Sequence, residues 1–74
     1  MKPRTQAFRT KVAEQIAQAG FGTSSFTWTS GPSRLVLIVN GTLKEFPMHA
    51  GMSRVRLAHH LGKIEAYGEM LKAA

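Results

Sequence analysis

Three histidines are the residues of this chain whose chemistry is most versatile. His49 follows a proline in the segment Pro47-Met48-His49, whereas His59 and His60 are adjacent. Histidine transfers protons near neutral pH, so His49 is a candidate acid or base. The alternative is that His49 fixes a corner of the backbone by hydrogen bonding. The structural role is favoured, because the surrounding sequence offers no catalytic partner.

Metal and cofactor chemistry find no support in the sequence. His59 and His60 would point about 100° apart on a helix and cannot chelate one metal together. The chain has no cysteine, and no carboxylate stands at ligand spacing from a histidine. A glycine-rich phosphate loop is missing, and the four glutamates form no evident acid and base pair. The sequence therefore predicts no metal and no cofactor, and it favours a non-catalytic protein over an enzyme.

The cationic side chains point to a polyanion as partner. Ten lysines and arginines face four glutamates, which gives a net charge of +6 and a pI near 10.6. Arg54 and Arg56 open the last predicted helix, where positive charge opposes the helix dipole. Binding of phosphate oxygens at this position would explain why two arginines stand there, because helix N-termini attract anions. The predicted nucleic-acid-binding residues are Arg54, Arg56, Lys63, Lys44 and Arg34.

The hydrophobic pattern predicts a helix at each end of the chain. In residues 3–19, Phe8, Val12 and Ile16 recur at helical spacing, and Gly20 is a suitable stop. The cations of this first helix, Arg4, Arg9 and Lys11, are expected to lie on a solvated surface. Residues 53–72 form the second predicted helix, with Ser53 as its cap.

Three strands are predicted between the helices. Residues 25–29 alternate, residues 34–39 are a strong strand, and residues 42–46 return after an Asn40-Gly41 hairpin turn. Gly31-Pro32 is expected to break the chain between the first two strands, and Pro47 to end the third. The predicted fold is a single α+β domain spanning residues 1–74, with the order α-β-β-β-α. Its three-stranded antiparallel sheet would carry both helices on one face.

The middle strand indicates a second surface. Its residues are apolar on both sides, so Val36 and Ile38, or their neighbours, would face away from the helices. Either a loop or a chain end covers them, or a second copy or another protein does. Trp28, Val36 and Ile38 are thus the candidate protein interface. Trp28 has two further interpretations, base stacking and, as the favoured one, packing in the core.

The chain resembles the HicA-type messenger-RNA interferase toxins, which have a fold like the double-stranded RNA-binding domain. In that family a strand opens Gly-Ser-His, a turn glycine follows, and Pro-x-His closes the hairpin. Here Gly31, Gly41 and Pro47-Met48-His49 stand at similar spacing, and Ala19-Gly20-Phe21 resembles the end of the family's first helix. The resemblance covers most of the chain and implies RNA as a target.

The resemblance fails at the catalytic position. The family's histidine follows Gly-Ser, but the matching segment is Gly31-Pro32-Ser33-Arg34, which places Ser33 there. Serine is no proton shuttle near neutral pH. The resemblance therefore supports the fold and argues against ribonuclease activity.

Three functional hypotheses follow. The first is a small HicA-like domain, non-catalytic, that binds RNA or DNA phosphates through the start of its second helix. The second is a phage or mobile-element protein that binds and inhibits a host protein complex. The third is a messenger-RNA interferase toxin that uses His49. No apolar run reaches the roughly 20 residues of a membrane span, so a cytoplasmic protein without membrane contact is expected.

Overall fold

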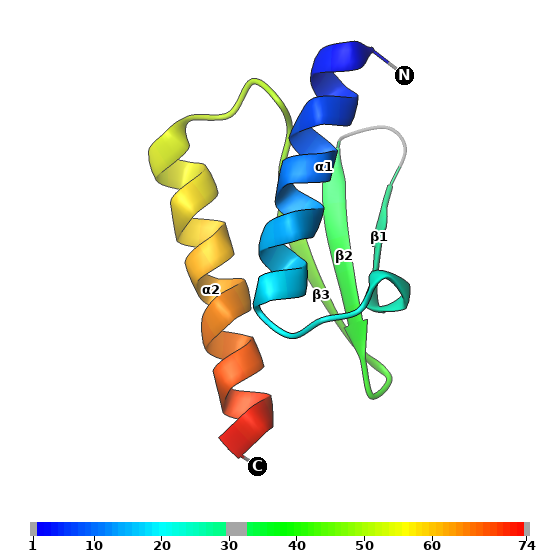
Figure 1. Ribbon diagram of the computed structural model, residues 1–74, viewed down its shortest axis with the longest axis vertical. Coiled ribbons are helices and arrows are strands. Elements are labelled where there is room, and N and C mark those ends of the chain that lie inside the picture. Colours follow the sequence, from blue (N-terminus) through cyan, green and yellow to red (C-terminus); the bar gives the residue numbers. More distant parts are fainter. Residues whose placement is uncertain (1, 30–32, 74) are drawn as a thin grey trace.

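The computed structural model describes residues 2–29 and 33–73 as a helix, three antiparallel strands and a second helix (Figure 1). The elements are α1 (Pro3–Gln18), the 3-10 turn η1 (Thr23–Ser25), β1 (Phe26–Trp28), β2 (Arg34–Val39), β3 (Thr42–Pro47) and α2 (Arg54–Ala73). The α+β class and the α-β-β-β-α order predicted from the sequence are confirmed.

The sheet has the order β1-β2-β3, with β2 in the centre and antiparallel to both neighbours. Asn40 and Gly41 take positive φ values of 52° and 78°, as a two-residue turn between twisted strands requires. Leu35 pairs with Phe46, and Leu37 pairs with Phe26. Because side chains alternate along a strand, these four residues share one face of the sheet.

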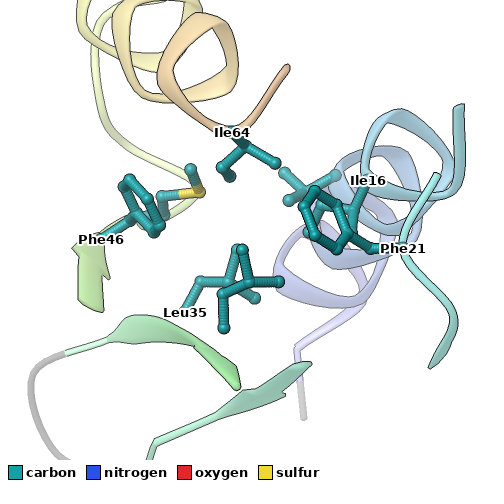
Figure 2. Packing of buried hydrophobic residues seen from close by; sticks show 8 residues of the cluster. Ile16, Phe21, Leu35, Phe46 and Ile64 are labelled. Carbon is teal, nitrogen blue, oxygen red and sulfur yellow. The ribbon is translucent and has the colours of Figure 1, made fainter. Parts of the chain in front are cut away.

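Both helices cover that face (Figure 1). Figure 2 shows Ile16 of α1 and Ile64 of α2 meeting above Leu35 and Phe46 of the sheet. Leu35 and Ile16 are completely shielded from solvent, with relative exposures of 0%. The remaining buried members of this core are Val12, Phe21, Leu37 and Met48. The apolar faces of the two helices thus pack against one face of the sheet and form a single core.

The end of α1 approaches α2 so closely that it leaves no room for a side chain. A Cβ atom on Gly68 would lie 2.5 Å from the Ala19 carbonyl oxygen and 3.3 Å from Phe21 Cε2. Gly20, with φ +100°, turns the chain immediately after this contact. Gly68 is therefore a requirement of helix packing, whereas a Cβ on Gly62 would meet nothing within 4 Å.

Some predicted boundaries differ from the observed ones. Ser25 was expected in the first strand but belongs to η1, so β1 begins at Phe26. Pro47 was expected to end β3 and is instead its last residue, opposite Arg34. Pro47 lies on an edge strand, where a missing N–H costs least. The predicted break at Gly31-Pro32 lies outside the described residues.

Candidate nucleic-acid interface

A groove of about 460 Å³ separates β3 from α2. Lys44 and Phe46 face it from the sheet, because they pair with Leu37 and Leu35 on the helix-covered face. We call it the β3–α2 groove, and its lining residues are Lys44, Glu45, Phe46, Lys63, Ala66 and Tyr67. Two of these six residues are lysines, one from each wall.

A row of side chains extends this groove toward the start of α2. Arg56, His60, Lys63 and Tyr67 follow one another at steps of four, three and four residues. At 3.6 residues per turn, this spacing places them along one flank of the helix. The first turn is fixed by Ser53, whose Oγ accepts a hydrogen bond of 3.2 Å from the Arg56 N–H. Arg56 and Lys63 therefore share the flank that faces β3.

Aromatic packing positions Lys44 within the groove. The Tyr67 ring stacks on Phe21 with ring centroids 5.9 Å apart and an interplanar angle of 19°. The Lys44 Nζ lies over the Tyr67 ring, 4.6 Å from its centroid. A cation over an aromatic face is attracted by the ring quadrupole, so Tyr67 holds the Lys44 ammonium beside the flank of Lys63.

His60 occupies the middle of the cationic flank. Its ring meets Phe46 edge to face, with centroids 6.0 Å apart, and its Nδ1 is buried without a hydrogen-bond partner among the residues that the structure describes. Burial lowers the pKa of His60, and the nearby charges of His59, Lys63 and Arg56 lower it further. Helical spacing places Arg56 and Lys63 on either side of His60, in agreement with this effect on its pKa.

Glu45 lines the same groove, but the ion pairs of the described residues leave the cations of this flank without a carboxylate partner. Within residues 2–29 and 33–73, the ion pair that forms is Arg34 with Glu45, at 3.9 Å. Lys44, Arg56 and Lys63 thus have no acidic partner within that part of the chain. Unpaired cations on a shared surface are the arrangement that attracts phosphate oxygens.

Two of the predicted phosphate ligands lie elsewhere. Arg54 is two residues from Arg56, which on a helix means about 200° around the axis, so the two side chains diverge. Arg34 pairs with Pro47, next to the core pair of Leu35, and therefore faces the opposite side of the sheet from Lys44. The structure therefore does not bring Arg54 and Arg34 together with the other three cations.

His49 has a structural contact of the kind expected for it. Its Nδ1 accepts a hydrogen bond of 3.2 Å from the Gly51 N–H, and its carbonyl accepts one of 3.1 Å from the Met52 N–H. These bonds shape the turn between β3 and α2. The Ser33 carbonyl accepts a 3.2 Å bond from the Met48 N–H, so Ser33 ties β2 to the same corner.

The predicted protein interface divides between two faces of the sheet. Trp28 pairs with Leu35 and lies on the helix-covered face, where its ring meets Phe8 with centroids 6.2 Å apart. Val36 and Ile38 alternate to the opposite face, so the structure does not bring them together with Trp28. On that open face Ile38 pairs with Leu43, and the two are 42% and 64% exposed.

Sequence reasoning missed His60 and Tyr67, which share the flank of α2 with Arg56 and Lys63. Helical spacing could have identified both residues. Arg56 and Lys63 lie two turns apart, and the residues four and eleven positions after Arg56, His60 and Tyr67, fall on the same flank. The pairing of Lys44 with Tyr67 needed the structure, since it depends on how β3 packs beside α2.

The fold and the groove define a small α-β-β-β-α domain with a cationic cleft between an edge strand and its last helix. Comparison with known proteins adds no relative: no family model, no curated protein and no solved structure matches this chain.

Proposed function

We propose that this chain is a small, non-catalytic nucleic-acid-binding domain that holds phosphates in the β3–α2 groove. The observation that carries the proposal is the pair Lys44 and Lys63 in one groove, with Arg56 on the same flank of α2. None of the three forms an ion pair with an acidic residue within the described part of the chain. Phosphate contacts of this kind give affinity and position, while carrying no sequence information. Binding is therefore expected to be independent of sequence and sensitive to salt.

Titration of a labelled duplex tests this function directly. Fluorescence anisotropy of a 20-base-pair RNA or DNA duplex in about 50 mM salt should reveal binding that weakens steeply as salt rises. Three phosphate contacts predict a loss of about 40-fold in affinity between 50 and 200 mM salt. Absence of binding to both duplexes at the lower salt concentration would refute the proposal.

The resemblance to HicA-type toxins supports the same function without cleavage. The element order agrees with the fold that the resemblance implied. By the spacing of that resemblance, Ser33 would take the position of the family's catalytic histidine. His49 uses its Nδ1 in the turn before α2, which argues against a role as a free acid or base. We accordingly propose a HicA-like domain that retains RNA or DNA binding and lacks ribonuclease activity.

Binding is expected to strengthen as the pH falls. His60 is surrounded by Arg56, His59 and Lys63 on α2 and by the neutral Phe46 on β3, and its pKa is lowered in the free protein. A bound phosphate adds negative charge and raises that pKa, so binding takes up a proton. Affinity should rise several-fold from about pH 7.5 to about pH 5.5, through the range in which histidine titrates.

Two glutamine variants separate His60 from the other histidines in this measurement. His60→Gln should flatten the pH dependence, whereas His59→Gln, at the exposed neighbouring position, should leave most of it in place. An unchanged pH profile in His60→Gln would show that His60 does not face the bound phosphates.

Self-association is a second candidate, favoured by the open face of the sheet. Ile38 and Leu43 lie opposite one another there, and Arg34 and Glu45 place one charge of each sign beside them. A second copy turned through a two-fold axis would match apolar to apolar and Arg34 to Glu45. Light scattering should then show a dimer that Leu43→Lys converts to a monomer. A wild-type monomer at high concentration would contradict this candidate.

Cytoplasmic location is part of the proposal and rests on the composition. The chain contains no cysteine, and its cationic surface suits an intracellular polyanion. Neither α1 nor α2, as far as the structure describes them, has the length and apolarity needed to cross a membrane.

A further inference from the structure

A second cationic site lies at the other edge of the sheet. The Arg9 guanidinium stacks over the Trp28 ring, with its central carbon 4.8 Å from the ring centroid. The Arg9 Nε is buried and has no hydrogen-bond partner in the described structure. Most buried polar atoms are satisfied, so an unsatisfied guanidinium N–H calls for an explanation.

The surroundings of Arg9 form a shallow hollow of about 480 Å³. Its lining combines one cation, one amide, one hydroxyl and an apolar wall, supplied by Gln6, Arg9, Thr10, Ala13 and Trp28. The hollow is separate from the β3–α2 groove, because β1 and β3 are the opposite edges of the sheet. This site is therefore independent of the proposed phosphate-binding surface.

The outer edge of β1 offers backbone groups beside this hollow. In the described sheet β1 pairs with β2 alone, and its other edge carries no strand. An extended segment added at this edge would complete the ladder and alternate its side chains between the two faces. A side chain placed next to Trp28 on the helix-covered face would meet the Arg9 guanidinium.

We propose that Arg9, Trp28 and the free edge of β1 form a docking site for an extended peptide segment of a protein partner, whose acidic side chain pairs with the Arg9 guanidinium. A carboxylate matches the fork of guanidinium donors in a bidentate manner. Tryptophan and arginine are also the residues that most often dominate the energetics of protein interfaces.

The lining of the hollow favours a carboxylate-bearing peptide over a nucleic acid. Arg9 is the only lysine or arginine among the described residues that line it. A polynucleotide needs several cations along its backbone or a free aromatic face for its bases. Arg9 already covers one face of the Trp28 ring, and Phe8 packs against the ring at an angle of 61°.

An array of matched peptides tests this site. Eight-residue peptides of alternating valine, isoleucine and threonine would carry a central glutamate, each paired with a twin that has glutamine there. Wild-type protein should bind the glutamate peptides at least about tenfold more strongly than their twins, and Arg9→Gln should remove that preference. Trp28 is the only tryptophan, so its fluorescence reports binding at this site in solution.

Further variants make the result decisive. Arg9→Lys should keep part of the preference, because it retains the charge but not the fork of donors. Lys11→Gln, on the same helix but outside the hollow, should bind as wild type does, and thermal melts confirm that all variants fold. Equal binding of glutamate and glutamine peptides would overturn the proposal. So would a duplex RNA that changes Trp28 fluorescence through Arg9, because the site would then recognise phosphate.

Discussion

Replacing Lys44, Arg56 and Lys63 together by glutamine is expected to weaken duplex binding about 100-fold at low salt. The three cations share the β3–α2 groove and its extension along α2, so their loss removes the phosphate contacts at once. The dependence of log affinity on log salt should also become shallower by about 2.7. Anisotropy titrations across a series of salt concentrations measure both effects.

A second triple variant controls for net charge. Lys2, Lys11 and Arg54 are exposed cations outside the groove, and replacing them by glutamine lowers the charge by the same amount. This variant should lose less than about tenfold in affinity, since only long-range attraction weakens. Equal losses in the two triple variants would show that the protein binds polyanions by charge alone, without a defined groove.

Replacing Gly68 by alanine is expected to lower the free energy of unfolding by about 2 kcal/mol. The new Cβ would meet the Ala19 carbonyl oxygen at 2.5 Å, and backbone cannot move aside as a flexible side chain does. The overlap outweighs the gain of about 1 kcal/mol in helix propensity. For a domain of this size the melting temperature should fall by about 10 °C.

Gly62→Ala is the matched control on the same helix. A Cβ there meets nothing within 4 Å, so only the helix propensity changes. The melting temperature should rise by about 5 °C, the opposite sign from the effect at Gly68. Two shifts of the same sign would show that α2 does not approach Ala19 as closely as the structure indicates.

Most of the fold could be predicted because several local signals agree. The spacing of Val12 and Ile16, the Asn40-Gly41 turn and the Ser53 cap each specify one element, and the structure contains all three features. The glycines of α2 were harder to interpret. Helix propensity alone would make Gly62 and Gly68 equally unfavourable in α2, by about 1 kcal/mol each relative to alanine, whereas packing against the end of α1 makes Gly68 necessary. A contact between distant segments has no local signature.

The candidate site was predicted only in part, because charge alone does not fix direction. Lys44 and Lys63 line one groove and Arg56 shares the flank of Lys63, but Arg54 and Arg34 face other sides. Helical periodicity was sufficient to separate Arg54 from Arg56, and strand alternation with Leu35 in the core separates Arg34 from Lys44. The aromatic contact that holds Lys44 depends on tertiary packing and could not be read from the chain.

The open face of the sheet shows the same limit. The doubly apolar strand left open which of its two sets of side chains faces away from the helices. In the structure Ile38 is exposed on that face beside Leu43, a neighbour that the sequence did not identify. Val36, on the same face, is only 7% exposed, so it contributes little to any surface there. Trp28 lies on the helix-covered face of the sheet, because it pairs with the buried Leu35.

Mapping the bound duplex by NMR tests the central claim most directly. Backbone amide and side-chain resonances of the wild-type protein would be followed during titration with a short duplex at low salt. The largest changes should fall on Arg56, His60, Lys63 and Lys44, the residues of the groove and its extension. Resonance changes centred instead on Lys11 and Arg54, with the resonances of the groove residues unchanged, would contradict the claim that the β3–α2 groove binds the duplex.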